Sequence, residues 1–147
     1  MISETTQITS QLRFDRLAVA DVMTMDPVTI GVEESVEAAE RLMATYGIRG
    51  LPVVDADGHL VGVVSQTDLM FEGGPSLSQL VRGRISTLRV GELMSSPPVT
   101  VGMSATLIEA ARLMRDERVH RLVVVNESAT PIGVLSATDY VAIVADG

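Results

Sequence analysis

The 147-residue chain contains no cysteine, no lysine and no tryptophan. Without cysteine the protein cannot form disulfides, use a thiol as a nucleophile or bind a metal through thiolates. Without lysine, Schiff-base chemistry is excluded, and all 11 basic residues are arginines, whose planar guanidinium groups suit phosphate. Because aromatic residues make up only 3% of the chain, the core must consist of aliphatic side chains and methionine.

Positive charge and long apolar runs are also scarce. A net charge of −8 disfavours a nucleic-acid partner, because phosphate contacts need a basic surface. No apolar run approaches the roughly 20 residues that a membrane-spanning helix needs. The first residues, Met1 to Thr6, lack the basic start and apolar stretch of a secretory signal. We therefore expect a soluble, cytoplasmic protein with neither a membrane nor a nucleic-acid partner.

An internal repeat organises the chain. Residues 22–68 recur at residues 93–139 at a constant offset of 71, and 17 of the 47 aligned pairs are identical. Repetition at this period predicts two related supersecondary units that share one core, with function between the copies. The expected domains are a lead-in segment at residues 1–18, a first repeat at 19–71, a linker at 72–89 and a second repeat at 90–147.

Each repeat has the pattern of a short strand, a helix, two strands and a closing helix, which makes the fold class α/β (α+β). Helical spacing predicts one helix that begins after Ser35 and ends at Gly47, and a second that begins after Thr106. Paired β-rich runs predict two hairpins, at residues 50–54 with 60–64 and at 122–125 with 132–135.

The two copies resemble the CBS domain, named after cystathionine β-synthase, over residues 19–144. The resemblance rests on the order of elements, on Pro-Val-Thr after a Met-Thr/Ser start, and on the closing Gly-x-x-Ser-x-Thr-Asp. It implies two tandem β-α-β-β-α repeats packed as a pseudo-twofold module. It also implies two clefts between the repeats that bind adenosine-containing molecules, and assembly of the modules into homodimers.

The closing motif, Ser65-Gln66-Thr67-Asp68 and Ser136-Ala137-Thr138-Asp139, suits an adenosine nucleotide. Each Asp could accept hydrogen bonds from the ribose hydroxyls, while the Ser and Thr hydroxyls and a helix start suit phosphate. Alternatively, the Thr and Asp merely cap a helix, which is the better explanation for a single such motif. Its presence twice at one register favours the ligand.

The run from Arg118 to Val125 looks like the His-Arg-Leu strand entry in the γ subunit of AMP-activated protein kinase, where these side chains meet nucleotide phosphate. By this resemblance Arg121 faces the cleft that holds Ser136, Thr138 and Asp139, and His120 leans toward the other cleft. Arg118 is expected on a solvated face that balances nearby acids.

The first copy departs from this pattern, because its matching positions are Arg49 and Gly50. The site with Ser65, Thr67 and Asp68 therefore lacks an equivalent of Arg121, and the two sites should be unequal. Adenine is expected beside Val28-Thr29 and Val99-Thr100. Val53 and Val124 could line that position or could equally be core residues.

Nothing in the sequence demands catalysis. There is no nucleophile with its base, no P-loop and no Rossmann glycine pattern. His59 is expected to be exposed in a turn, and two distant histidines without cysteine disfavour a metal site. The leading hypothesis is a stand-alone, non-enzymatic module that binds AMP, ADP or ATP as a regulatory ligand and signals to an unidentified protein. The alternative is a ligand-free interaction or dimerisation module.

Overall fold

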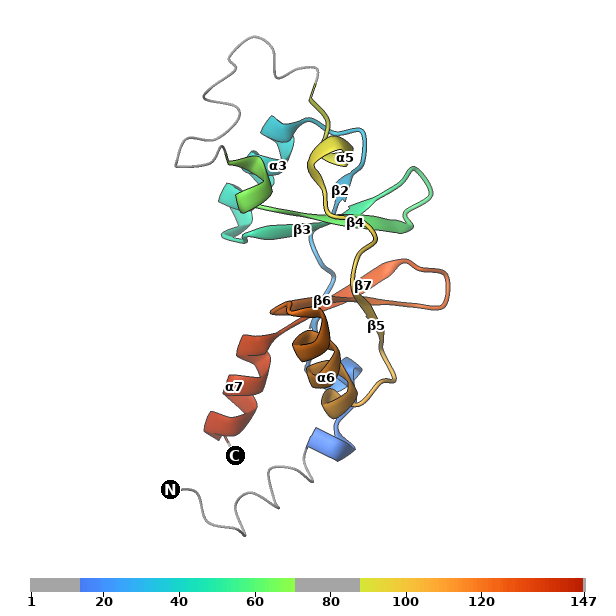
Figure 1. The fold of residues 1–147 in the computed structure, drawn as a ribbon, viewed down its shortest axis with the longest axis vertical. Helices are drawn as coiled ribbons and strands as arrows, with labels where there is room; N and C mark the ends of the chain where they lie inside the picture. Colours follow the sequence, from blue (N-terminus) through green and yellow to red (C-terminus); the bar gives the residue numbers. More distant parts are fainter. Residues whose placement is uncertain (1–13, 71–87, 147) are drawn as a thin grey trace. The chain divides into compact units, whose positions relative to one another are not determined.

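The computed structural model describes residues 14–70 and 88–146 (Figure 1). Most of the expected lead-in segment and of the expected linker lies outside these ranges. The helices and strands of the first half are α2 (Val19–Val22), β1 (Thr24–Met25), β2 (Ile30–Gly31), α3 (Val36–Tyr46), β3 (Gly50–Val54), β4 (Leu60–Ser65) and the 3-10 helix η1 (Thr67–Leu69). Those of the second half are α5 (Val90–Leu93), β5 (Thr100–Gly102), α6 (Leu107–Glu117), β6 (Arg121–Val125), β7 (Pro131–Ser136) and α7 (Ala137–Asp146).

The two long helices begin and end as their sequences predict. The Ser35 Oγ accepts a hydrogen bond from the Ala38 N–H at 3.1 Å, and Gly47 ends α3 with φ of 64°. In the second copy the Thr106 Oγ1 accepts from the Glu109 N–H at 3.1 Å. Both hairpins are confirmed. The closing helices differ, because the described part of the first copy ends in the three-residue η1, whereas α7 has ten residues.

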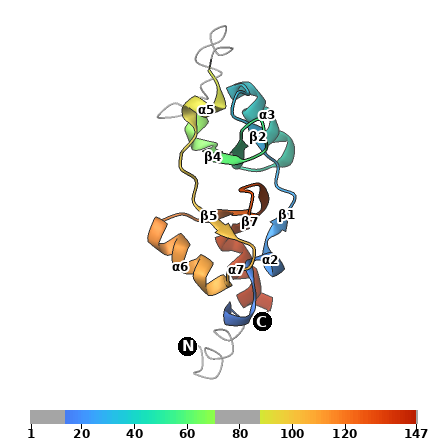
Figure 2. The ribbon, with the colours of Figure 1, turned by 90° about the vertical axis from the view of Figure 1, so that its right-hand side faces the viewer.

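Two compact units divide the chain. Unit 2 comprises the described residues of the ranges 27–98 and 129–131. Its sheet has the order β2-β3-β4, with β2 parallel and β4 antiparallel to β3. In Figures 1 and 2, α3 and α5 cover one face of this sheet. The buried core is aliphatic, as predicted, and consists of Ile30, Val36, Ala39, Met43, Leu51, Val53, Val64, Leu69 and Val90.

Unit 1 comprises the described residues of the ranges 1–26, 99–128 and 132–147. Its sheet has the order β1-β7-β6-β5, in which β5 is parallel to β6 and β1 is antiparallel to β7. Helices α6 and α7 lie on one face of the sheet (Figures 1 and 2). Its buried core residues include Val19, Leu107, Ala110, Met114, Leu122, Val124 and Leu135.

Each compact unit contains most of one sequence repeat together with the first helix of the other repeat. Helix α2 opens the first repeat, yet Val19 is buried in the core of unit 1 and its N–H donates to the Ala105 carbonyl at 2.8 Å. Helix α5 opens the second repeat, yet the Val90 N–H donates to the Glu34 carbonyl of unit 2 at 2.8 Å. A sequence repeat and a compact unit are therefore different divisions of the chain.

Tyr140 anchors α7, a helix with no fully buried residue. Its hydroxyl donates a 2.6 Å hydrogen bond to the Leu107 carbonyl at the start of α6, and its ring centroid lies 5.7 Å from that of Phe14. Burial, with a smaller effect of the Asp139 carboxylate, raises the pKa of Tyr140 to about 12. The hydroxyl therefore keeps its proton at neutral pH and remains a donor.

Candidate functional site

The closing motif of the second copy forms a hydrogen-bonded cluster where β7 meets α7. The Asp139 Oδ2 accepts from the Ser136 N–H at 2.7 Å and from the Ser136 hydroxyl at 3.2 Å. The Ser136 and Thr138 hydroxyl oxygens lie 2.7 Å apart. Thr138 is exposed, and Ser136 and Asp139 are half-buried, so solvent can reach all three. The structure thus brings together three of the residues that the sequence indicated.

The first copy repeats this arrangement in a simpler form. The Asp68 Oδ2 accepts from the Ser65 N–H at 2.8 Å, and the Asp68 N–H donates to the Ser65 hydroxyl at 3.2 Å. Thr67 is exposed and takes no part in this pair. Each Asp thus holds the turn before its helix, as the capping alternative requires.

Capping occupies only one oxygen of each carboxylate. Among the described residues, the Oδ1 atoms of Asp68 and Asp139 accept no hydrogen bond, because every bond to these carboxylates involves Oδ2. A carboxylate can accept several hydrogen bonds at its two oxygens. One Asp can therefore cap the helix and still accept from a ligand.

His120 and Arg121 lie beside this cluster at the start of β6. The His120 carbonyl accepts from the Ala137 N–H at 2.8 Å, which holds the start of β6 next to the start of α7. Both side chains are exposed. Neither makes a hydrogen bond or ion pair within the described ranges, so their donors are available to an anion.

Unit 2 has the same backbone framework with different side chains. The Gln66 N–H donates to the Arg49 carbonyl at 2.8 Å, the counterpart of the bond between Ala137 and His120. Arg49 is exposed, but Gly50 stands where unit 1 has Arg121. The two sites are therefore chemically unequal.

The residues expected near adenine lie at or just before the start of β5 in unit 1 and just before β2 in unit 2. Thr100 opens β5 in register with Val123, and Val99 packs against the core of unit 1. In unit 2, Val28 packs against the core and the half-buried Thr29 directly precedes β2. Val53 and Val124 have no exposed surface, so the core alternative holds for both.

Thr100, Arg121 and Ser136 lie where three neighbouring strands of unit 1 start or end, on the same side of the sheet's width. Thr100 begins a strand parallel to β6, whose first residue is Arg121. Ser136 ends β7, the neighbour of β6 on its other side, next to His120. Two strand spacings, about 10 Å, separate β5 from β7. That span suits a ligand with a base at one end and phosphate at the other.

A pocket that sequence reasoning missed occurs at equivalent places in both units. In unit 2 it has a volume of about 550 Å³, and in unit 1 about 390 Å³. The pocket of unit 1 is lined by Met114, Arg115, Arg118, Val119, His120 and Ala137. Their repeat counterparts Met43, Ala44, Gly47, Ile48, Arg49 and Gln66 all line the pocket of unit 2.

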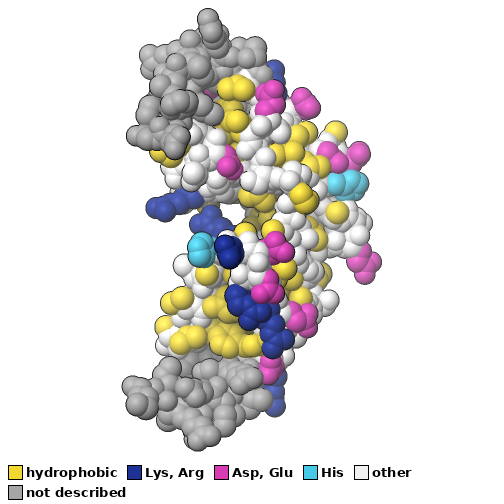
Figure 3. All heavy atoms as spheres, in the orientation of Figure 1, with side chains coloured by type: hydrophobic (Ala, Val, Ile, Leu, Met, Phe, Trp, Pro, Cys, Tyr) yellow, Lys and Arg dark blue, Asp and Glu magenta, His cyan; other side chains and the backbone are white. Residues whose placement is uncertain are grey.

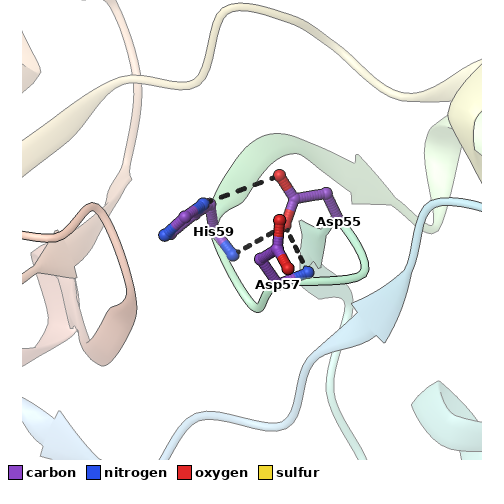
Figure 4. Close-up of side chains that lie close together, drawn as sticks. All are labelled: Asp55, Asp57 and His59. Carbon is purple, nitrogen blue, oxygen red and sulfur yellow. Dashed lines mark hydrogen bonds and ion pairs between the residues drawn. The ribbon is translucent and has the colours of Figure 1, made fainter.

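The turn between β3 and β4 gathers Asp55, Asp57 and His59 (Figure 4). One ligand atom from each lies within 4.8 Å of the others. However, the Asp55 Oδ1 accepts from the Asp57 and His59 N–H groups at 2.9 and 3.0 Å, so formation of the turn accounts for the arrangement. His59 is exposed, which confirms that prediction.

Comparison with known families identifies the fold. The family model of the CBS domain matches residues 19–73 and 90–146. The chain therefore belongs to the CBS domain family, and the predicted α/β fold with two tandem repeats is confirmed. Within the described ranges, no helix is both long and apolar enough to span a bilayer.

The relatives differ in how much of their length this chain matches. An inosine-5'-monophosphate dehydrogenase of Korarchaeum cryptofilum is 38% identical over 114 residues, which are 78% of this chain but 21% of the relative. The chain thus spans about a fifth of that relative. A CBS domain-containing protein of Dictyostelium discoideum is 30% identical over 128 residues, 84% of this chain and 88% of the relative.

A solved structure shows the same fold over most of the chain. CBSX2 from Arabidopsis thaliana is 32% identical and matches with a TM-score of 0.75, covering 88% of this chain and 94% of CBSX2. A structure of CBSX2 in complex with AMP matches with a TM-score of 0.71 at 33% identity, covering 88% of this chain and 96% of that one.

Proposed function

We propose that this protein is a regulatory module that binds an adenosine-containing ligand, AMP, ADP or ATP, at the start of α7 in unit 1. The observation that carries the proposal is the cluster of Ser136, Thr138 and Asp139, beside an Arg121 side chain without a partner in the described ranges. The AMP complex of CBSX2 supports the class of ligand.

Each side chain has a role in this proposal. The Asp139 Oδ1 accepts from the ribose hydroxyls while Oδ2 continues to cap α7. The Ser136 and Thr138 hydroxyls, with the N–H groups at the start of α7, donate to the first phosphate. Arg121 adds a two-pronged guanidinium contact to that phosphate. The adenine base lies toward Val99 and Thr100, at the start of the neighbouring strand β5.

The ligand acts by favouring one conformational or assembly state over another, which requires different affinities for the two states. These roles involve no bond-making step, so the module senses energy state or a metabolite rather than transforming it. In this proposal the weaker site of unit 2, with Ser65, Thr67, Asp68 and Arg49, binds a less charged ligand or none. A cytoplasmic location remains a sequence-based prediction.

Binding of nucleotides to wild-type protein and to Arg121→Ala tests the function. We expect adenine nucleotides to raise the melting temperature of the wild type by mass action. In Arg121→Ala the dissociation constant should rise roughly tenfold or more, because a charge-assisted hydrogen bond is lost. Arg112→Ala, on the exposed side of α6 away from the pocket and the cluster, serves as the control and should bind as the wild type does. If no adenosine compound shifts the melting temperature of the wild type, the proposal is wrong.

We further propose that the module forms a homodimer through α7. Val141 and Val144 on this helix are 65% and 57% exposed, and no residue of α7 is fully buried. Figure 3 shows hydrophobic side chains gathered over α7. An apolar helix face of this kind is typical of an interaction surface. This observation also favours the second candidate function, a ligand-free dimerisation module.

Replacing both Val141 and Val144 with glutamate should convert the dimer to a monomer, because each buried carboxylate would lose its solvation. Light scattering during size-exclusion chromatography measures the molar mass. Met103→Glu, at an exposed apolar residue outside α7, should leave the mass of a dimer unchanged. A monomeric wild type, or a double variant that remains dimeric, would contradict the proposed interface.

A further inference from the structure

Arg118 occupies a backbone conformation that favours glycine. It ends α6 with φ of 57°, and its repeat counterpart Gly47 ends α3 with φ of 64°. Glycine is the common residue at this position because a Cβ atom is strained there. The second copy thus has a long basic side chain at the position where the first copy has glycine. A strained backbone of this kind is a reason to ask what the side chain contributes.

The Arg118 side chain lines the pocket of about 390 Å³ in unit 1. Arg115 and His120 line the same pocket, whereas Ala44, Gly47 and Arg49 hold the equivalent places in unit 2. The exchange of Ala44 and Gly47 for two arginines makes the pocket of unit 1 the more basic. Figure 3 shows arginine side chains gathered over α6, although the protein as a whole has a net charge of −8.

Of the two arginines that line this pocket, Arg118 is the one whose guanidinium group is not already paired with a carboxylate of the described residues. Arg115 is paired with its neighbour, since its Nε lies 2.9 Å from the Asp116 Oδ1. Arg118 and His120 have no hydrogen-bond or ion-pair partner for their side chains within residues 14–70 and 88–146. An anion in the pocket would therefore meet a guanidinium group that need not first break another contact.

The pocket adjoins the proposed nucleotide site. Ala137, which lines it, lies between Ser136 and Thr138 in the chain, and its N–H donates to the carbonyl of His120. A phosphate held by the Ser136 and Thr138 hydroxyls is therefore next to the wall of the pocket. The phosphates that follow it along a polyphosphate chain can enter the pocket.

We propose that this pocket receives the β- and γ-phosphates of a nucleotide and that Arg118 is the residue that favours ADP and ATP over AMP. This inference rests on the proposed function, since it extends the same site. AMP has no second phosphate, so a contact with Arg118 does not contribute to its affinity. In unit 2, Gly47 offers no such group, so the same preference is absent there.

Titration calorimetry with AMP, ADP and ATP on wild-type protein, Arg118→Gly and Ala129→Gly tests this inference. Ala129 is the matched control, because it also has a positive φ, 63°, and does not line the pocket. Both variants should melt a few degrees higher, since each relieves a strained backbone. Arg118→Gly should bind AMP within about twofold of the wild type but ADP and ATP roughly tenfold more weakly. Ala129→Gly should bind all three as the wild type does.

The outcomes separate this inference from the proposed function. If Arg118→Gly binds ADP and ATP as tightly as the wild type, Arg118 has no ligand role, while AMP binding by both proteins still supports the proposed function. If Arg118→Gly loses the same affinity for AMP, ADP and ATP, Arg118 does not distinguish nucleotides by their number of phosphates. If the wild type binds none of the three, the proposed function fails and this inference fails with it.

Discussion

Replacing Gly62 by alanine should lower the free energy of unfolding by about 2 kcal/mol, the usual cost of overpacking a well-filled site. A Cβ atom at this position in β4 would lie 2.6 Å from the Met94 Sδ and 2.8 Å from the Ser95 carbonyl oxygen. The methionine can move, but the carbonyl cannot move freely. Ser95 exchanges two backbone hydrogen bonds with Val63, of 3.1 and 2.9 Å, that hold it against the strand.

Urea unfolding of three glycine variants measures this effect. Gly102→Ala is the control, because its Cβ atom would meet nothing within 4 Å, and its stability should stay within about 0.5 kcal/mol of the wild type. The stability of Gly133→Ala should lie between those of the Gly62 and Gly102 variants. Its Cβ atom would approach the flexible Met23 Sδ at 2.5 Å but the Thr24 carbonyl oxygen only at 3.1 Å. Equal stabilities for the Gly62 and Gly102 variants would contradict the steric explanation.

The elements that the sequence predicted correctly depend on local signals. Ser35 and Thr106 cap their helices through side-chain bonds to N–H groups three residues on, so a short stretch of sequence contains the whole interaction. Gly47 ends α3 for a reason equally local, its positive φ. The hairpins follow from two β-rich runs with a turn between them.

What the sequence did not predict depends on distant parts of the chain. Four residues such as those of α2 carry no sign of which core they enter, and Val19 joins the core that contains Leu107 and Leu135. Gly62 is visible as part of a motif, but the reason for it is Met94, 32 positions away in sequence and visible only in the fold. Val53 and Val124 could have lined a site, and only packing shows that they are buried.

Arg118 shows how the candidate site could be predicted only in part. Alignment of the repeats places it opposite Gly47, but the sequence alone gives neither the φ angle of Arg118 nor the pocket that its side chain lines. Arg118 is exposed, as the sequence predicts, and its place in the pocket is the part that only the fold shows. The cluster of Ser136, Thr138 and Asp139 was accessible to sequence reasoning because its members lie within four consecutive residues and recur at a fixed offset.

Asp139→Ala should reduce both stability and nucleotide affinity. The variant removes the acceptor for the Ser136 N–H and hydroxyl, so the free energy of unfolding should fall by about 1 kcal/mol, as for the loss of a helix cap. It also removes the acceptor for the ribose hydroxyls, and the dissociation constant of AMP should rise about 10- to 100-fold. Urea unfolding and titration calorimetry measure the two quantities separately.

Asp139→Asn distinguishes the two roles, because they use different oxygens of one carboxylate. The amide oxygen can replace Oδ2 in capping α7, so most of the stability should remain. The amide nitrogen then stands in place of Oδ1 and cannot accept from a ribose hydroxyl, so affinity should still fall about tenfold. Asp68→Asn, with the same capping bond to Ser65 but no arginine counterpart of Arg121, should change AMP affinity little. If Asp139→Asn binds AMP as the wild type does, helix capping alone explains the repeated motif.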